Sequence, residues 1–306
     1  MKISIIGAGN VGATAANVIA LKNIASDVVL LDVKEGVAEG KSVDMLQQLA
    51  IMGSNTRIVG CTNDYKKTSN SDIVIITSGI ARKPGMKREE LIGINAGIMK
   101  DVVNACTVYS PEAIYIIVSN PADTLTYLTI KHMGLPRNKV VGMSGVLDSS
   151  RFIYYLSQAI GCHPNDVDGM VIGVHGDFML PLTRFAFYKG IPVNKLLDAR
   201  VMSEVCAKTK DGGGILTRLL GTSAWYAPGA AIATMAEAIA KDTKKLMSCI
   251  TYLDGEYGNT DVCAAVPVIL GRAGMERIVD LELNAEEQAL FNQSTAASKQ
   301  INRMLK

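Results

Sequence analysis

The chain has 306 residues, of which 48% are hydrophobic and 20% are charged, and its formal net charge is +2. This composition is ordinary for a globular enzyme of about two domains, and the lack of a long basic run argues against a surface for nucleic acid or membranes. We expect a cytoplasmic protein with reduced thiols and no metal site, because the six cysteines are scattered and the sequence shows neither a signal peptide nor a membrane-spanning stretch.

Short apolar runs alternate with amphipathic helical patterns in the first half of the chain. Runs without polar interruption, such as Ile73–Ile76, suit strands that are covered on both faces, as in a parallel sheet. The expected strands are 3–6, 28–31, 58–59, 73–77, 114–118 and 140–143, and the expected helices are 11–21, 37–46, 89–109 and 121–132. This alternation predicts an α/β fold, a Rossmann-type doubly wound parallel sheet, over residues 1–145.

The pattern changes after residue 145. We expect helices at 147–160, 228–246 and 284–306, and two strand-like segments at 169–174 and 182–188 that suit an antiparallel pair. Asn284 and Glu287 have the N-cap and N3 positions of the last helix, as in a capping box. These elements predict a second, α+β substrate or catalytic domain over residues 146–306, which shares a wide interface with the first.

A glycine-rich segment lies between the first expected strand and the first expected helix. Gly7 allows a tight turn, Gly9 lets the backbone approach a pyrophosphate, and Gly12 permits close helix–strand packing, as in dinucleotide-binding folds. Asp32 ends the next strand, where a carboxylate can bind both ribose hydroxyls and repel a 2′-phosphate. NAD is therefore favoured over NADP. The alternative is a tight turn followed by an ordinary surface aspartate.

The segment Val118-Ser119-Asn120-Pro121 closes another strand at its carboxyl end, where open parallel sheets bind ligands. Asn120 can hydrogen-bond the nicotinamide ribose or the substrate there. It also has the position of a helix N-cap that precedes Pro121 at N1. The two roles are compatible.

His175 follows an apolar run and is flanked by glycines in Gly173-Val174-His175-Gly176-Asp177, which leaves its imidazole accessible at a strand end. Such a histidine can take a hydroxyl proton while a hydride leaves for a nicotinamide, although a lone histidine is more often structural. A carboxylate should hold its tautomer. Asp148 is the expected partner, and Asp177 is the local competitor.

Three arginines accompany this histidine. Arg151 shares a helix face with Asp148, three residues away, so the two form either a surface ion pair or a unit that grips a substrate carboxylate. Arg82 and Arg88 lie in a polar segment that suits either a mobile lid or a solvated basic loop. Fixed cations beside one titratable base suit a small dianion that gains or loses a proton.

Together these segments resemble the lactate/malate dehydrogenase family, and within it the malate dehydrogenases built like lactate dehydrogenases. The resemblance spans the chain and includes residues 7–12, 32, 81–88, 119–121, 147–151, 175–177 and 254–258. It implies that His175 accepts and donates the proton, that Asp148 orients it and that Arg151 clamps the C1 carboxylate. It implies that Arg88 polarises the reacting carbonyl from a closing loop. The implied NAD contacts are Gly7, Ala8, Gly9, Asn10, Val11, Gly12, Asp32, Asn95, Val118, Ser119 and Asn120.

Arg82 lies where this family selects its substrate. Lactate dehydrogenases tend to have glutamine there, whereas an arginine supplies the countercharge for a second carboxylate. Closing a lid over an unpaired carboxylate costs on the order of 3–5 kcal/mol. The resemblance therefore implies reversible NAD-dependent oxidation of (S)-malate to oxaloacetate, a tricarboxylic acid cycle step, with L-lactate or another 2-hydroxy acid as the alternative substrate. A catalytically idle NAD-binding or redox-sensing protein is the alternative from another class.

Some residues depart from the usual pattern of the family. Val174, Phe178 and Lys87 replace more common residues, which leaves the chemistry untouched but bears on affinity and lid kinetics. The helices expected at 11–21 and 228–246 are more apolar than one internal face requires, so we expect burial against another subunit. The resemblance implies a homodimer or homotetramer, and the sequence does not choose between them.

Overall fold

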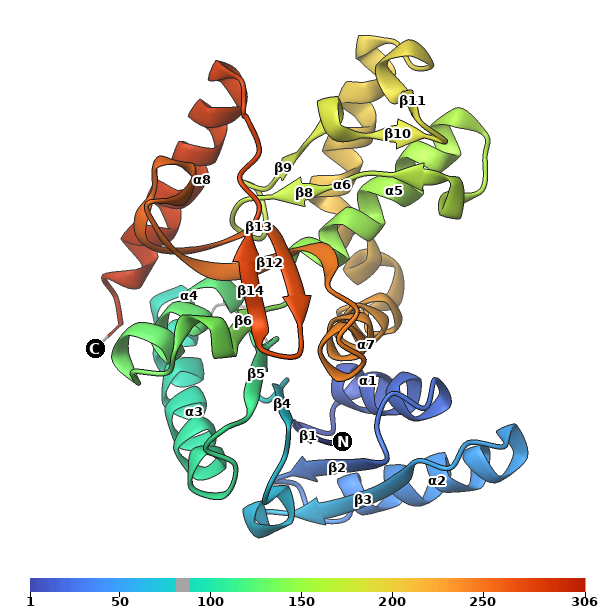
Figure 1. The fold of residues 1–306 in the computed structure, drawn as a ribbon, viewed down its shortest axis with the longest axis vertical. Helices are drawn as coiled ribbons and strands as arrows, with labels where there is room; N and C mark the ends of the chain where they lie inside the picture. Colours follow the sequence, from blue (N-terminus) through green and yellow to red (C-terminus); the bar gives the residue numbers. More distant parts are fainter. Residues whose placement is uncertain (81–87, 306) are drawn as a thin grey trace.

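The structure, a computed structural model, describes residues 1–80 and 88–305. Its first half contributes the parallel strands β1 (Lys2–Ile6), β2 (Asp27–Asp32), β3 (Arg57–Thr62), β4 (Ile73–Ile76), β5 (Ile114–Ile117) and β6 (Val140–Gly142). The second half adds the antiparallel strands β12 (Lys245–Asp254), β13 (Thr260–Gly271) and β14 (Gly274–Ile278). Within the described residues these strands form one sheet in the order β14-β13-β12-β6-β5-β4-β1-β2-β3 (Figure 1).

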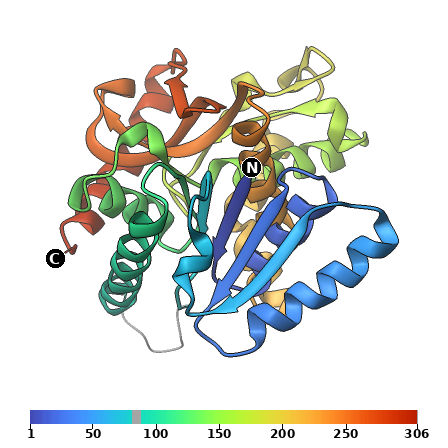
Figure 2. The same ribbon diagram turned by 60° about the horizontal axis from the view of Figure 1, so that its bottom comes forward.

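Helices cover both faces of the parallel part of the sheet (Figures 1 and 2). On one face lie α1 (Asn10–Leu21), α2 (Val37–Met52) and α7 (Tyr226–Ala240), and on the other lie α3 (Arg88–Tyr109) and α4 (Ala122–Tyr127), which η2 (Leu128–His132) continues. Alternate residues of β4 pack into the two layers: Ile73 and Ile75 belong to the first, and Val74 and Ile76 to the second. The expected doubly covered parallel sheet is confirmed.

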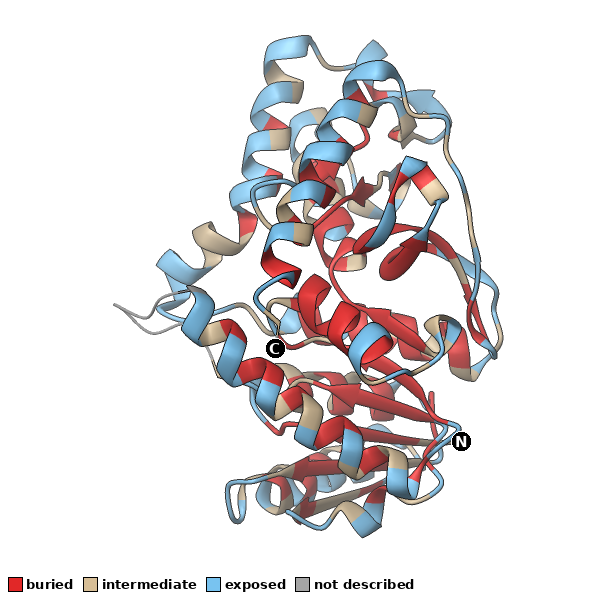
Figure 3. Ribbon diagram, turned by 90° about the vertical axis from the view of Figure 1, so that its left-hand side faces the viewer, coloured by how far each residue is buried: buried red, intermediate tan, exposed pale blue. Residues whose placement is uncertain are grey.

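The second half builds a smaller α+β unit beside the sheet. It contains α5 (Gly145–Ile160), α6 (Ala199–Leu220) and the short strands β7 (Val167–Asp168), β8 (Val171–Ile172), β9 (Leu180–Pro181), β10 (Phe187–Tyr188) and β11 (Ile191–Pro192). Phe152, Leu156 and Val205 are buried in its core. Figure 3 shows buried residues concentrated along the strands and the inner sides of the helices. The last helix, α8 (Ala285–Asn302), begins with the predicted capping box of Asn284 and Glu287.

Short helical turns connect these elements: η1 (Tyr65–Thr68), η3 (Arg137–Lys139), η4 (Pro164–Asp166), η5 (Thr183–Phe185), η6 (Val193–Lys195) and η7 (Glu256–Gly258). Among the described helices, α3 is long and apolar enough to cross a membrane by length and composition alone. Its residues Met99, Val103 and Cys106 are buried against the sheet, which accounts for its apolar character.

Several expected elements have other bounds in the structure. The segment expected as a strand at 182–188 contains the turn η5, and only Phe187 and Tyr188 pair as a strand, with β7 and β11. The helix expected at 228–246 ends at Ala240, because Asp242 and Lys244 adopt φ of 51° and 52°, and β12 begins directly afterwards. Helix α6 and strands β12, β13 and β14 were not expected from the sequence.

The apolar surfaces of α1 and α7 are covered within the chain. The two helices lie side by side in Figure 1, and a Cβ on Gly229 of α7 would lie 2.5 Å from Thr14 Cγ2 of α1. Packing within the chain thus covers apolar surface on both helices, and their burial against a second subunit stays a prediction. The proposed division at residue 145 stays a prediction, since β12 pairs with β6 through Ile250 and Gly142 and continues the sheet across it.

Candidate active site

The glycine-rich turn joins β1 to α1 and is too tight for larger residues. Gly7 has a φ of 111°, and a Cβ on Gly12 would lie 1.9 Å from the Gly7 carbonyl oxygen. Asp32 at the end of β2 supports the turn, because its Oδ2 accepts a hydrogen bond from the Ala8 N–H at 2.6 Å. The turn thus brings backbone, a helix N-terminus and a carboxylate together, an arrangement that fits the pyrophosphate and ribose of a dinucleotide.

Asn95 connects three segments next to this turn. Its side chain is 2% exposed. Its Oδ1 accepts from Ile80 N at 2.9 Å, and its Nδ2 donates to Ile80 O at 3.1 Å and to Asn120 O at 2.7 Å. Asn95 was expected to contact the cofactor. In the structure its side-chain amide holds the loop after β4 against the loop after β5.

Asn120 does not cap a helix. The N-cap of α4 is Pro121, the helix begins at Ala122, and the Asn120–Pro121 peptide bond is cis. The N-cap interpretation of Asn120 is wrong, because the cap must directly precede the first helical residue. Instead, the main-chain oxygen of Asn120 accepts a hydrogen bond from Asn95, and Asn120 is exposed beside the site.

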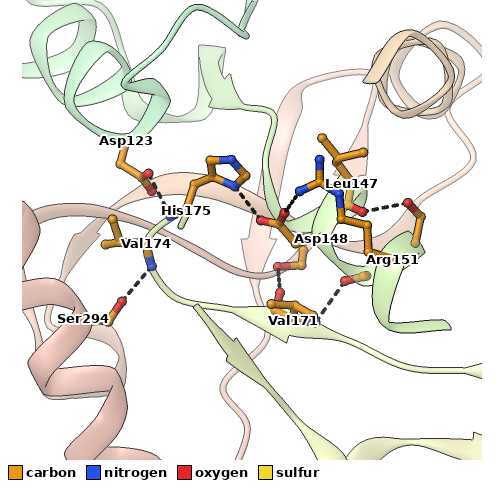
Figure 4. A network of polar contacts seen from close by, with 11 residues as sticks. Asp123, Leu147, Asp148, Arg151, Val171, Val174, His175 and Ser294 are labelled. Carbon is orange, nitrogen blue, oxygen red and sulfur yellow. Dashed lines mark hydrogen bonds and ion pairs between the residues drawn. The ribbon is translucent and has the colours of Figure 1, made fainter. Parts of the chain in front are cut away.

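His175 and Asp148 meet from distant parts of the chain, as Figure 4 shows. Asp148 lies in the first turn of α5 and is 2% exposed, and its Oδ2 lies 2.8 Å from His175 Nδ1. The sequence left Asp177 as a competitor for this position, but Asp148 occupies it and Asp177 is exposed. Gly173 and Gly176 adopt φ of 90° and 112°, which explains the glycines on either side of the histidine.

The main chain around His175 is fixed by three further contacts. The Val174 N–H donates to Ser294 Oγ of α8 at 2.8 Å, and the His175 N–H donates to Asp123 Oδ2 of α4 at 3.1 Å (Figure 4). Gly173 forms a β-bridge with Ala265 of β13. Asp123 was not expected at the site, because an aspartate in the first turn of a helix is ordinary.

The environment of His175 favours its protonated form. Its side chain is 30% exposed. Partial burial opposes protonation, but the charge and hydrogen bond of Asp148, together with the charge of Asp123, outweigh this effect and raise the pKa of His175 above its usual value. An imidazole with a raised pKa and a carboxylate on Nδ1 can exchange a proton through Nε2 near neutral pH.

Arg151 completes this group. Its Nη1 donates to Asp148 Oδ1 at 3.1 Å, and its side chain is 12% exposed. The guanidinium lies along α6, where a Cβ on Gly212 would approach Arg151 Cδ to 2.9 Å. The glycines of α6 therefore make room for the arginine, a role that the sequence analysis missed because glycine in a helix usually signals only low propensity.

These residues border one cavity of about 470 Å³. It brings six of the expected ligand contacts together with His175, and Ala224, Gly213 and Thr217 also line it. Asp148 does not line the cavity, because it contacts His175 from behind. The other expected contacts among the described residues that do not line it are Gly7, Ala8, Gly9, Asn10, Gly12 and Asp32. The expected site residues in its lining are Val11, Asn95, Val118, Ser119, Asn120, Arg151 and His175.

Two expected substrate contacts cannot be placed. Arg82 lies outside the described residues, and Arg88 begins α3 but its side chain lies outside the described part of the chain. Within residues 1–80 and 88–305, no group of three or more His, Cys, Asp or Glu side chains could hold a metal ion.

Comparison with known proteins agrees with this geometry. Residues 1–142 match the family model for the NAD binding domain of lactate/malate dehydrogenase, and residues 145–305 match that for its alpha/beta C-terminal domain. A malate dehydrogenase from Parabacteroides distasonis is 60% identical over 306 residues, which cover 100% of this chain and 98% of that protein.

Solved structures of the same kind superpose closely. The malate dehydrogenase from Salinibacter ruber has a TM-score of 0.95 at 42% identity, with 100% of this chain and 97% of that chain covered. A lactate dehydrogenase from Cryptosporidium parvum, complexed with lactic acid and nicotinamide adenine dinucleotide, has a TM-score of 0.95 at 37% identity, with 99% and 97% covered.

Proposed function

Since this chain belongs to the lactate/malate dehydrogenase family, we propose that it catalyses the reversible NAD-dependent oxidation of (S)-malate to oxaloacetate, a step of the tricarboxylic acid cycle. One observation carries the proposal: His175 and Arg151, which Asp148 holds together, line the same cavity as Val11 of the glycine-rich turn and Asn120. A proton acceptor, an anion-binding cation and a dinucleotide site are thereby in reach of one small molecule.

His175 takes the proton in this reaction. Its Nδ1–H donates to Asp148, which leaves Nε2 free to accept the hydroxyl proton of malate. Bound NAD supplies the acceptor for the hydride that leaves the same carbon. In the reverse direction the protonated imidazole returns the proton to the oxaloacetate carbonyl oxygen, a step that its raised pKa supports.

The arginines select the substrate. Arg151 binds the carboxylate next to the reacting carbon, and its charge is held in place by Asp148. We assign Arg82 to the second carboxylate and Arg88 to the reacting oxygen, on the sequence resemblance alone. The small side chain of Ala224, which lines the cavity, leaves room for a side chain as long as that of Arg82.

The deciding experiment compares oxaloacetate with pyruvate, each with NADH and with NADPH, in steady-state assays. We expect oxaloacetate and NADH to be preferred. Arg82→Gln should lower kcat/KM for oxaloacetate by roughly a hundredfold to several thousandfold while sparing pyruvate, because an unpaired carboxylate costs on the order of 3–5 kcal/mol. Lys83→Gln, which removes a neighbouring cation from the same segment, is the matched control and should leave the preference unchanged.

Two results would contradict the proposal. A higher rate with pyruvate would favour the second candidate, a dehydrogenase of L-lactate or another 2-hydroxy acid, which the similarity to the Cryptosporidium parvum lactate dehydrogenase keeps open. NADH binding without turnover of either substrate would favour an NAD-sensing protein.

The assembly and the location are also proposals. We propose a homodimer or homotetramer in the cytoplasm. Its support is a set of exposed apolar side chains on α2, where Val43 is 54% and Ile51 is 85% exposed. Sedimentation equilibrium gives the molecular mass in solution, and a value of one chain at micromolar concentration would contradict an oligomer.

A further inference from the structure

Asp123 is a buried carboxylate that contacts the acid–base group from the side opposite Asp148. It lies in the first turn of α4 and is 3% exposed. Its Oδ2 accepts the His175 N–H at 3.1 Å, whereas its Oδ1 is buried and has no hydrogen-bond partner among the described residues. A half-satisfied buried carboxylate is costly, so its presence beside the histidine calls for a reason.

The charges around Asp123 come from the active site. His175 and Asp148 act on it from the loop after β8 and from α5, and Cys263 faces it from β13. Burial raises the pKa of Asp123 to about 7, and the charge and N–H of His175 act in the opposite direction. Both protonation states of this carboxyl group are therefore accessible at neutral pH.

The two carboxylates next to His175 have different surroundings. Asp148 binds the imidazole Nδ1 with one oxygen and Arg151 with the other, so an arginine always offsets its charge. Asp123 binds only the main chain of His175 among the described residues, and Figure 4 shows it on the other side of the histidine. Its charge is therefore balanced when the imidazole is protonated and unbalanced when the imidazole is neutral.

We propose that Asp123 is a positioning residue of the acid–base site: Oδ2 fixes the His175 main chain, and the negative charge of Asp123 stabilises the protonated imidazole. The inference rests on the proposed function, in which His175 cycles between its two protonation states. Asp123 then shifts the pH range in which His175 changes from the neutral form, which takes a proton from malate, to the protonated form, which gives a proton to oxaloacetate.

The test replaces the charge and keeps the shape. Asp123→Asn retains an oxygen acceptor for the His175 N–H. We expect it to move the acid limb of the malate oxidation profile to lower pH by roughly one unit. Ser294→Ala is the matched control, since it removes the neighbouring contact to the Val174 N–H without altering charge. It should leave the limb where it is in the wild type.

A spectroscopic readout separates this inference from the proposed function. The chain has 3 histidines, so imidazole NMR signals of the substrate-free protein can be assigned with His132→Asn and His163→Asn. Asp123→Asn should lower the titration midpoint of His175 whether or not the protein turns over malate. An unchanged midpoint in an active enzyme would overturn the role of Asp123 alone.

The wild-type protein provides a measurement that does not depend on how the variant folds. When the charges of two neighbouring ionisable groups interact, the two groups titrate in coupled steps. The His175 signal of the wild type should therefore follow a two-step curve around neutral pH. A single-step curve would overturn the inference, and absence of turnover with a two-step curve would overturn only the proposed reaction.

Discussion

Replacing Asp148 by asparagine tests the centre of the site. Asp148 uses both carboxylate oxygens, one for His175 Nδ1 at 2.8 Å and one for Arg151 Nη1 at 3.1 Å, in a position that is 2% exposed. An asparagine side chain has one acceptor oxygen, so it must turn its NH₂ group toward one of these two partners.

Either orientation damages the reaction. If the NH₂ faces Arg151, two donors oppose each other and the buried guanidinium loses its countercharge, which costs about 1.5–3 kcal/mol. This corresponds to a roughly ten- to hundredfold loss in kcat/KM. If the NH₂ faces His175, Nδ1 becomes the acceptor and Nε2 carries the hydrogen, so the imidazole cannot take the malate proton. A comparable change of tautomer in serine proteases costs about 10⁴-fold in kcat.

The assay follows malate oxidation by the absorbance of NADH from about pH 5.5 to about pH 9.5. This range brackets the ordinary histidine pKa of about 6.5. The charge of Asp148 raises the pKa of His175, so the variant should need a lower pH to protonate its imidazole, and its residual activity should extend to lower pH. NADH binding, measured by fluorescence, checks that the variant is folded and should change little.

Asp177→Asn is the matched control for this prediction. Asp177 lies two residues from His175 and is exposed, and the same chemical change there leaves the Asp148 contact intact. We expect wild-type kcat and an unshifted pH profile. Equal losses in the two variants, or wild-type activity of Asp148→Asn, would refute the assignment of Asp148 as the carboxylate that orients the imidazole.

Two further predictions concern the frame of the site. Asn95→Ala removes three hydrogen bonds to Ile80 and Asn120, each worth about 1 kcal/mol, and should weaken NADH binding by at least roughly tenfold in a fluorescence titration, because the cavity-lining loops lose their common support. An unchanged Kd would mean that other contacts hold these loops. Asn284→Ala removes the N-cap of α8 and should lower the free energy of unfolding by about 1 kcal/mol in a denaturant titration, without changing KM.

Local sequence patterns predicted the parallel half of the fold well, because its strands are short and covered on both faces. The run Ile73–Ile76 has no polar residue, and in the structure its side chains alternate between two buried layers. The glycine-rich turn followed from the same kind of local constraint, since Gly12 has no space for a side chain. Both features depend on residues that are adjacent in the sequence.

The elements that the sequence did not reveal depend on distant contacts. Three consecutive glycines, Gly212, Gly213 and Gly214, oppose a helix by about 1 kcal/mol each relative to alanine. They are nevertheless in the middle of α6, where the first two pass close to Arg151 of α5. The cost in propensity is offset by packing that no local pattern contains.

The same reason explains which site residues could be predicted. The glycines around His175 made it recognisable, and the helical spacing paired Asp148 with Arg151. Asp123 gave no such signal, because its contact with the His175 N–H joins residues 52 positions apart. The loop that carries His175 is also held by the β-bridge between Gly173 and Ala265. Ala265, one partner of that bridge, looks unremarkable in the sequence.

The continuous sheet positions the glycine-rich turn relative to His175. β1 carries the glycine-rich turn and β13 holds Gly173 next to the histidine, and both strands belong to the same sheet. The junction is the pair Gly142 and Ile250, where a Cβ on Gly142 would lie 2.7 Å from Ile250 Cβ. A larger residue at 142 would press on Ile250 of β12 and on Thr126 of α4, so we expect it to shift the strands that connect the dinucleotide turn with the loop of His175. The geometry of proton and hydride transfer therefore depends on a glycine that touches neither reactant.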